Sequence, residues 1–186
     1  MLDEVLLQLP ITAFLRLKSK FQAVFGLYKD FAGAGRLCST INYYFDREGT
    51  SRKYFQKDLP RGLAMLASAK EAKHIVITES PIDALSHRQL QCQQAAQAVA
   101  SERQKRLEET MYLATCGSLS VGIQQELAQV FEQAKAKSQQ VVLALDNDRA
   151  GKQMASQLEA LLQEKQCHYR VELPELGKDW NESLML

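Results

Sequence analysis

The sequence predicts an α/β fold in which helices cover both faces of a parallel four-stranded sheet, giving three layers, with a small α+β extension in front. Two observations support this. From residue 73 onward, short strand-like runs alternate with helical segments, which is the pattern of a parallel sheet. These runs are apolar without polar alternation, as strands buried on both faces are. We therefore expect two units, residues 1–72 and residues 73–186.

The first unit combines helical and strand-like patterns. Residues 2–20 have helical spacing with a break near Pro10. Residues 21–55 are rich in glycine and aromatic residues, and two pieces within them, AVFGLY and STINYYF, favour short strands. The segment 62–72 has the pattern of a helix. These patterns predict helices at both ends of the extension, with strands between them.

The second unit is predicted element by element. Strands are expected at residues 74–78, 111–115, 141–146 and 168–173. Helices are expected from Pro81 onward, over 121–136 and over 149–166. A further polar helix is predicted from about 89 to 109. Its helix propensity is high but its apolar face is weak, so we interpret it as a solvated helical insertion.

Composition narrows the class of protein. The chain has 186 residues, of which 46% are hydrophobic and 24% charged, as expected for a compact domain with an extension. The longest apolar run, Val141 to Leu145, is too short to span a membrane, and the N-terminus lacks the basic region of a signal peptide. The four cysteines form no C-x-x-C pair, which favours buried apolar roles over zinc binding. These features predict a soluble, cytoplasmic protein.

The net charge of +1 hides an asymmetry along the chain. Residues 1–70 hold 11 Lys/Arg and 6 Asp/Glu, a net charge of +5, whereas residues 71–186 hold 12 and 16, a net charge of −4. A basic front and an acidic back suggest that the first part contacts an anion and the second holds a cation. Ordinary surface variation would give the same numbers.

Acidic residues follow the predicted strands. Glu79 ends the first strand, Asp146 ends the third with Asp148 two residues later, and Asp179 follows the last. Ligands of parallel sheets collect beyond the carboxyl ends of the strands, so these four carboxylates would converge on one rim. Crowded carboxylates repel one another, and a divalent cation relieves that repulsion. The sequence therefore predicts a site for Mg²⁺ or Mn²⁺, which prefer oxygen ligands.

Several of these acids have a simpler interpretation. Asp83 stands three residues after Ser80, in a helix-capping pattern. Asp148 is placed to cap the helix that follows it. Capping does not explain Glu79 or Asp146, because both directly follow apolar strands.

The helix after Asp148 has its own unusual residues. Gly151 lies within it, where glycine costs about 1 kcal/mol relative to alanine, so a close backbone approach or tight packing is expected there. Arg149 and Lys152 would suit a phosphate at the helix N-terminus, and would equally suit plain solvated surface.

Three motifs in order, ESPID, DNDRAGK and GKDWNE, resemble the Toprim domain shared by bacterial primases, type IA and type II topoisomerases and some nucleases. The loop TCGSLS resembles a family loop as well. The match is closest to primases, and TESPIDALS looks like primase-related proteins of plasmids and mobile elements. Ala150 stands where topoisomerases would have a third acid, which argues against that branch.

The resemblance implies roles for particular residues. It implies that Glu79 is a general acid/base or a metal ligand. It implies that Asp146, Asp148 and Asp179 bind Mg²⁺ or Mn²⁺. It implies that Asp83 supports them. Further supporting candidates are Arg149, Lys152 and Lys178.

The resemblance also implies a function. It points to a metal-dependent nucleic-acid enzyme domain, with primase-related nucleotidyl transfer or phosphodiester chemistry in DNA replication or mobile-element maintenance. The partners would be DNA or RNA, nucleotides, and a separate primase- or helicase-type domain. A non-catalytic module that binds metal and nucleic acid, and a Toprim-type nuclease, are the alternatives.

A basic and aromatic segment precedes the acidic unit. Residues 42–61 interleave aromatic side chains with basic ones, which suits phosphates and stacked bases. The candidate nucleic-acid-binding residues are Arg47, Arg52, Lys53 and Lys57. The alternative is a β-hairpin with its aromatic residues in the core and its lysines outside.

Overall fold

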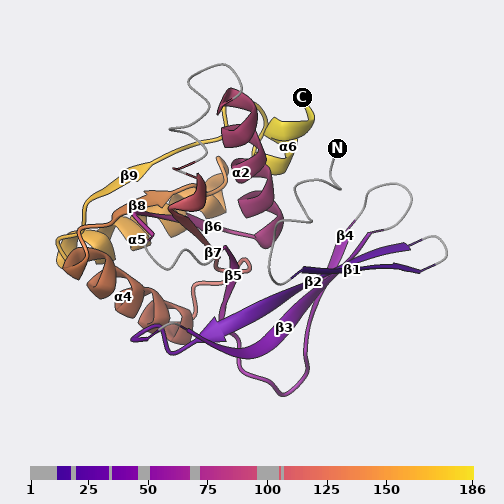
Figure 1. The fold of residues 1–186 in the computed structure, drawn as a ribbon, viewed down its shortest axis with the longest axis horizontal. Helices are drawn as coiled ribbons and strands as arrows, with labels where there is room; N and C mark the ends of the chain where they lie inside the picture. Colours follow the sequence, from indigo (N-terminus) through magenta and orange to yellow (C-terminus); the bar gives the residue numbers. More distant parts are fainter. Residues whose placement is uncertain are drawn as a thin grey trace.

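A computed structural model describes residues 12–17, 20–33, 35–45, 51–67, 72–95, 105 and 107–186. Its strands are β1 (Thr12–Leu17), β2 (Lys20–Lys29), β3 (Arg36–Phe45), β4 (Ser51–Phe55), β5 (Leu63–Ala67), β6 (His74–Thr78), β7 (Thr110–Ala114), β8 (Gln140–Leu143) and β9 (Tyr169–Val171). Its principal helices are α2 (Pro81–Ala95), α4 (Val121–Ala136), α5 (Arg149–Glu164) and α6 (Trp180–Met185). The described strands form one nine-stranded sheet in the order β4-β3-β2-β5-β7-β6-β8-β9, with β1 paired to β2 (Figure 1).

The parallel part of this sheet confirms the predicted fold class. Strands β7, β6, β8 and β9 run parallel in that spatial order, and they correspond to the four predicted strands. The helix predicted over 121–136 has those bounds. Strand β8 ends at Leu143, earlier than predicted, and Leu145 and Asp146 belong to the loop that leaves the sheet.

Two predicted helices are wrong, because both segments are strands. Residues Thr12–Leu17 form β1, which pairs antiparallel with β2, and Leu63–Ala67 forms β5 between β2 and β7. Both runs are short and apolar, and such runs fit either structure until a neighbouring strand offers backbone hydrogen bonds. Residues 2–11, 18–19 and 68–71 of the predicted helices lie outside the described residues.

Strand β5 joins the antiparallel and parallel parts into one sheet. Ala64 is in register with Leu27 of β2 on one side and with Ala114 of β7 on the other. At the start of β5, a Cβ on Gly62 would lie 2.2 Å from the backbone oxygen of Tyr28, so only glycine fits this approach. One sheet therefore contains strands from both predicted units. The division of the chain into two units at residue 72 stays a prediction.

The helical insertion predicted over about 89–109 is described only in part. Helix α2 continues through its first residues to Ala95. Residues 96–104 and 106 lie outside the described residues.

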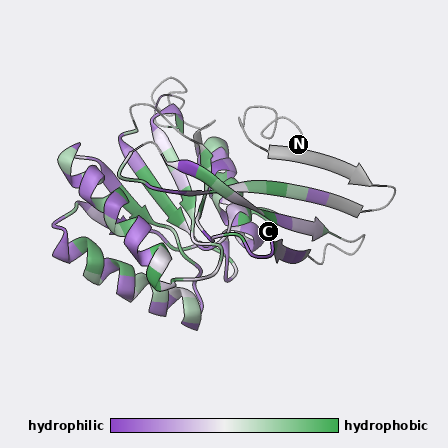
Figure 2. Cartoon of the chain, turned by 90° about the horizontal axis from the view of Figure 1, so that it is seen from below, coloured by the Kyte–Doolittle hydropathy of each residue, from purple (hydrophilic) through white to green (hydrophobic). Residues whose placement is uncertain are grey.

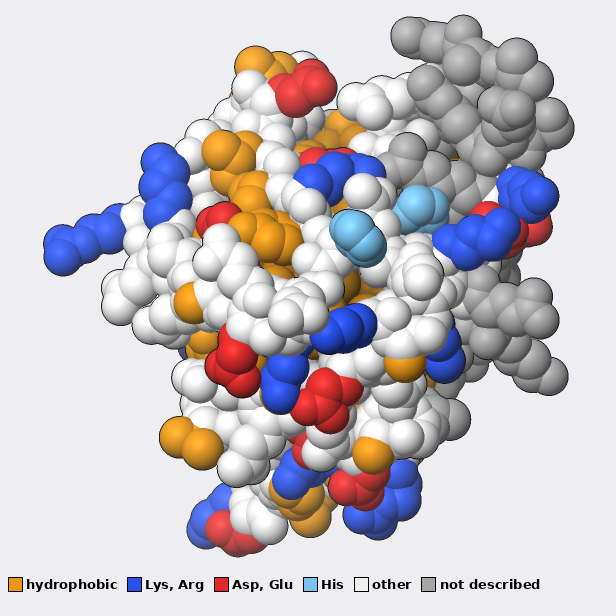
Figure 3. Space-filling view, turned by 90° about the vertical axis from the view of Figure 1, so that its left-hand side faces the viewer, with side chains coloured by type: hydrophobic (Ala, Val, Ile, Leu, Met, Phe, Trp, Pro, Cys, Tyr) orange, Lys and Arg blue, Asp and Glu red, His pale blue; other side chains and the backbone are white. Residues whose placement is uncertain are grey.

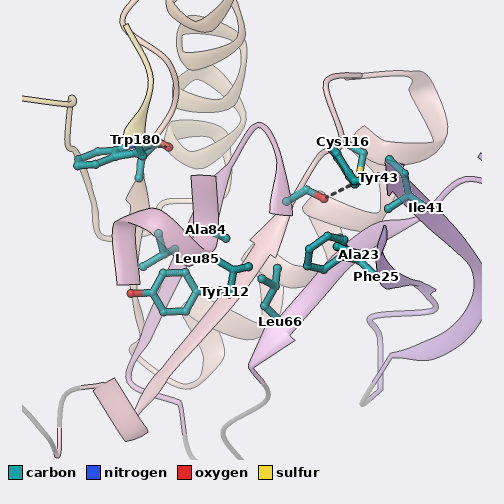
Figure 4. Close-up of a cluster of buried hydrophobic side chains, with 14 of the residues drawn as sticks. Ala23, Phe25, Ile41, Tyr43, Leu66, Ala84, Leu85, Tyr112, Cys116 and Trp180 are labelled. Carbon is teal, nitrogen blue, oxygen red and sulfur yellow. Dashed lines mark hydrogen bonds between the residues drawn. The ribbon is translucent and has the colours of Figure 1, made fainter. Parts of the chain in front are cut away.

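Two apolar clusters lie on opposite faces of the parallel strands. Val76, Tyr112 and Val142 pack with α2 and with Trp180 of α6, while Ile75 and Leu143 pack with α4 and α5. Figure 4 shows the first cluster extending from Trp180 to the side chains of β2 and β3. Figure 2 shows apolar residues along the strands and polar ones on the outer sides of the helices. Helices on both faces complete the three predicted layers.

The expected burial of the cysteines is confirmed for one of the four. All four cysteines are free; Cys116 is buried in the first cluster, whereas Cys38, Cys92 and Cys167 are half-buried. No helix in the described part of the chain is both long and apolar enough to cross a bilayer.

A buried histidine joins α2 to the end of β9. His87 is 2% exposed, and its Nε2 lies 2.8 Å from Oε2 of Glu172. Arg170 also pairs with Glu172. Burial by itself raises the pKa of Glu172, but the contacts with His87 and Arg170 outweigh burial and bring this pKa down from 4.5 to about 2. The ion pair should therefore contribute stability that depends on pH.

We expect Glu172→Gln to lower the free energy of unfolding by about 1–2 kcal/mol at neutral pH, discounted for the partial exposure of the carboxylate. Because its folded-state pKa is depressed, the contribution of Glu172 is complete above pH 4.5 and is lost as the pH falls toward 2. Urea unfolding at several pH values measures this. Glu164→Gln, at an exposed carboxylate, is the control. A stability difference that stayed constant from pH 7 to pH 3 would contradict the assignment.

Candidate functional site: an acidic cavity at the carboxyl edge of the sheet

Glu79 occupies the turn between β6 and α2. Its backbone oxygen accepts a hydrogen bond from the N–H of Gly117 at 2.8 Å, which ties the turn to the loop after β7. Its side-chain Oε1 accepts from the N–H of Asp146 at 3.4 Å. The side chain is half-buried, and burial, with the charges of Asp148 and Asp83, raises the pKa of Glu79. Three strand ends therefore meet around this one residue.

Ser80 and Asp83 begin α2 as the capping pattern predicts. The Asp83 N–H donates to Ser80 Oγ at 3.1 Å, and Ser80 Oγ–H donates to Asp83 Oδ2 at 2.6 Å. Asp83 is only 6% exposed. Burial, together with the charge of Asp179, raises its pKa to about 6. Ser80 thus caps the helix, while Asp83 holds the Ser80 hydroxyl in place and adds a buried carboxyl to the acidic group.

Asp146 has the most perturbed environment of the strand-end acids. Its Oδ1 is buried, and among the described residues it has no hydrogen-bond partner. Burial raises the pKa of Asp146 to about 8, and the charges of Asp83, Glu79, Asp179 and Asp148 add to this. A buried carboxylate without a donor costs free energy, which a cation or a proton would relieve.

Asp148 and Asp179 each cap a helix. Asp148 Oδ1 accepts from the N–H of Gly151 at 2.9 Å, as the capping alternative predicted, and Asp179 Oδ1 accepts from the N–H of Glu182 at 2.7 Å. Each carboxylate has a second oxygen that these bonds do not use. Helix capping and ligand binding are therefore compatible at both positions.

The loop before α6 is held against the turn that carries Asp146. The N–H of Asn147 donates to the backbone oxygen of Lys178 at 2.7 Å. Trp180 Nε1–H donates to the backbone oxygen of Ala144 at 2.8 Å, and the indole is buried. These two bonds explain why Asp179, in an irregular loop, reaches the acids of the other strand ends.

Gly151 lies where α5 passes closest to the strand end. A Cβ there would lie 2.1 Å from the backbone oxygen of Asp146 and 2.7 Å from Oε1 of Glu79. This agrees with the close approach expected from the sequence, because only a residue without a side chain lets the helix pass so near.

These residues surround an open cavity of about 370 Å³. It is lined by Tyr43, Lys53, Glu79, Ser80, Ile82, Asp83, Gly117, Asp146, Asp179 and Asn181. Lys53 comes from β4, and its Nζ donates to the backbone oxygen of Cys116 at 3.3 Å. The antiparallel part of the sheet thus places a cation beside the acids, and the Lys53 charge lowers the pKa of Glu79 against the effect of burial.

The structure brings together most of the acids singled out from the sequence. Glu79, Asp83, Asp146 and Asp179 line the cavity, and the Asp148 charge acts on two of them. The basic supporting candidates are not among the residues that line the cavity. Arg149 and Lys152 are exposed in the first turn of α5, and Lys178 Nζ lies 3.4 Å from Glu182 Oε1.

The four candidate nucleic-acid-binding residues do not all belong to the cavity. Lys53 enters the cavity, whereas Arg52 and Lys57 are exposed outside it. Arg47 lies outside the described residues. Sequence reasoning missed Tyr43 and Asn181 as cavity residues. The alternation of β3 could have indicated Tyr43, and Asn181 lies within the GKDWNE motif.

The donor set suits a hard divalent cation. In the part of the chain that the structure describes, no group of three or more His, Cys, Asp or Glu side chains is arranged to hold a metal ion as the side chains stand. The unpartnered Oδ1 of Asp146 nevertheless offers a free ligand atom among further carboxylates. Mg²⁺ is usually bound through one or two carboxylates with several waters, so the residues present fit such an ion.

Carboxylates gathered at the carboxyl edge of a parallel sheet are placed to bind a divalent cation. The chain belongs to the Toprim-like family, whose model matches residues 76–184, more than half of the chain. Toprim domains generally bind divalent metal ions. No curated protein matches the sequence.

A solved structure resembles the whole fold. It is the Aquifex aeolicus primase, in a crystal structure of its zinc-binding and RNA polymerase domains. The TM-score is 0.50 at 15% sequence identity, and the match covers 92% of this chain and 40% of that one. The chain therefore spans well under half of the primase chain that it resembles. The likeness extends over the antiparallel strands as well as the Toprim-like part.

Proposed function

We propose that this chain is the catalytic domain of a metal-dependent enzyme of nucleic-acid phosphodiesters, related to primases, with Mg²⁺ as its ion. The observation that carries the proposal is the buried Oδ1 of Asp146, which has no hydrogen-bond partner among the described residues and lies among further acids of the strand ends. Such a group is unfavourable for stability alone, which makes a ligand role the better explanation. DNA replication or the maintenance of a mobile element, in the cytoplasm, would be its setting.

Each acid has a role in this proposal. Asp146 and Asp148 hold the ion, with Asp179 and Asp83 contributing charge around it. A bound divalent cation supplies shielding of phosphate charge and activation of an attacking oxygen. Glu79 moves the proton, because its half-buried carboxyl has a raised pKa and remains open to the cavity. Lys53 offers a positive charge to a phosphate oxygen at the same cavity.

We expect Glu79→Gln to reduce metal-dependent turnover by about 10²–10⁴-fold without unfolding the protein, since the amide keeps the shape of the side chain but not its proton transfer. Primer synthesis and cleavage of single-stranded DNA and RNA, each with Mg²⁺ and with Mn²⁺, are the two assays. Glu164→Gln, at an exposed carboxylate on α5, is the matched control and should keep wild-type turnover. Full activity of Glu79→Gln in either assay would overturn the assigned role.

A non-catalytic module that binds metal and nucleic acid is the second candidate. Asp148 and Asp179 each use one carboxylate oxygen as a helix cap, which leaves a single oxygen of each for an ion and favours binding over catalysis. Binding of nucleic acid and metal without turnover in both assays would support the module. Cleavage products in place of extended primers would instead identify a nuclease, which uses the same acids.

A further inference from the structure

The pleat of the antiparallel strands divides the basic and aromatic segment between two faces of the sheet. Residues directly opposite in an antiparallel pair share a face, and successive residues alternate. Tyr43 is opposite Lys53, and both line the acidic cavity. Tyr44 is opposite Arg52, and Asn42 is opposite Tyr54, on the other face. The segment therefore has an inner set at the cavity and an outer set away from it.

The outer set exposes two tyrosine rings side by side. Tyr54 is 52% exposed and Tyr44 is 36% exposed, whereas Tyr43 on the inner face is 5% exposed. The rings of Tyr44 and Tyr54 meet edge to face, with centroids 5.5 Å apart. Arg52, which is exposed, stands next to both in the sheet. Adjacent exposed aromatic rings form a contiguous apolar patch, and such patches often mark interaction sites.

Amide side chains extend this face onto β2. Gln22 Nε2 donates to Asn42 Oδ1 at 3.0 Å and to the hydroxyl of Tyr44 at 3.2 Å. These bonds hold the Tyr44 ring in one place, so little conformational entropy would be lost when a ligand stacks on it. The outer face thus combines fixed aromatic rings, amide groups and a guanidinium.

We propose that the outer face of β3 and β4, formed by Tyr44, Tyr54 and Arg52 with Asn42 and Gln22, binds single-stranded nucleic acid. Exposed bases stack on tyrosine rings, the guanidinium pairs with phosphate, and amides offer hydrogen bonds to base edges. This chemistry matches a strand with unpaired bases better than it matches a duplex, whose bases are already stacked.

Figure 3 shows another face of the described part of the molecule. On that side of the molecule, basic and acidic side chains are interspersed rather than gathered by sign. A strand on the outer face would lie across the sheet from the cavity residues Tyr43 and Lys53. The outer face is therefore an anchoring site that needs neither the metal nor the acids, and it goes beyond the proposed catalytic function.

The test is fluorescence anisotropy of a labelled oligodeoxythymidylate, titrated with the protein in EDTA. We expect Tyr54→Ala to weaken binding by about 5- to 100-fold, which corresponds to the loss of one stacked base. Tyr54→Phe keeps the ring and should bind like the wild type. Arg52→Gln should weaken binding and reduce the slope of log K against log salt by about 1.

Val121→Ala, at an exposed residue of α4, is the surface control and should change nothing. Thermal melting of each variant verifies that it is folded. A folded Tyr54→Ala protein that binds within about twofold of the wild type would overturn the proposal, and so would a wild type that does not bind the oligonucleotide. The second result would leave the outer face to a protein partner. Because no metal is present, neither result bears on the turnover of Glu79→Gln.

Discussion

Asp146→Asn is expected to make the metal-free protein more stable while removing its response to divalent cations. In the wild type, burial and the charges of the neighbouring acids raise the pKa of Asp146 to about 8. An asparagine of the same shape carries no charge and can donate from its amide. After a discount for the exposure of this carboxyl, the gain is about 1–2 kcal/mol, or about 2–6 °C in melting temperature.

The pH dependence of this gain has a definite direction. An acid whose folded-state pKa is raised contributes stability below its unfolded-state pKa of 3.8, and that contribution is lost as the pH rises toward 8. The variant should therefore resemble the wild type near pH 4 and exceed it increasingly up to pH 8. Melting curves across this range, without metal, measure the difference.

With divalent cations, the wild type should become more stable than Asp146→Asn. A ligand that binds only the folded state stabilises it by mass action, so Mg²⁺ or Mn²⁺ should raise the melting temperature of the wild type. Asp146→Asn lacks the charged ligand and should not respond. Glu175→Gln, at an exposed carboxylate away from the cavity, is the control and should respond like the wild type. An Asp146→Asn protein that is less stable without metal, or that still responds to it, would contradict the site.

Gly151→Ala is expected to destabilise the protein by about 2–3 kcal/mol, or about 5–10 °C in melting temperature, because its methyl group has no room. The new Cβ would lie 2.1 Å from the backbone oxygen of Asp146 and 2.7 Å from Oε1 of Glu79. Backbone does not move aside as a flexible side chain does, so α5 must shift away from the strand end. The same shift would disturb the Asp146–Glu79 contact and weaken metal binding.

Gly122→Ala is a matched control in another helix. A Cβ on Gly122 in the first turn of α4 would meet nothing within 4 Å. Alanine is the better helix former, so this variant should be as stable as the wild type or more stable by up to about 1 kcal/mol. Thermal melting and the metal-induced shift in melting temperature measure both variants. A Gly151→Ala protein as stable as Gly122→Ala would show that the close approach is not required.

Much of the parallel part of the fold could be predicted from the sequence. The runs HIVIT and VVLAL are apolar on both faces, and burial on both faces is what β6 and β8 show. The residues Glu79 and Asp146 directly follow such runs. An acid at that point in the chain emerges at the carboxyl edge of the sheet because the strand places it there.

The antiparallel part was harder to predict for a physical reason. The segments Thr12–Leu17 and Leu63–Ala67 are short and apolar, and helix and strand bury such runs about equally well. Their partners decide between the two, and those partners lie elsewhere in the chain. Strand β5 pairs with β7, more than forty residues later, and no local pattern reports that pairing.

The sequence by itself determined that carboxylates follow the parallel strands closely, and that basic and aromatic residues are interleaved in 42–61. Only the tertiary structure decided that Lys53 enters the acidic cavity while Arg52 lies on the opposite face. The physical reason is that successive side chains of a strand point to opposite faces of the sheet, whereas only the packing of other elements decides which face is buried. The same packing excludes water around Asp146, and that exclusion raises its pKa.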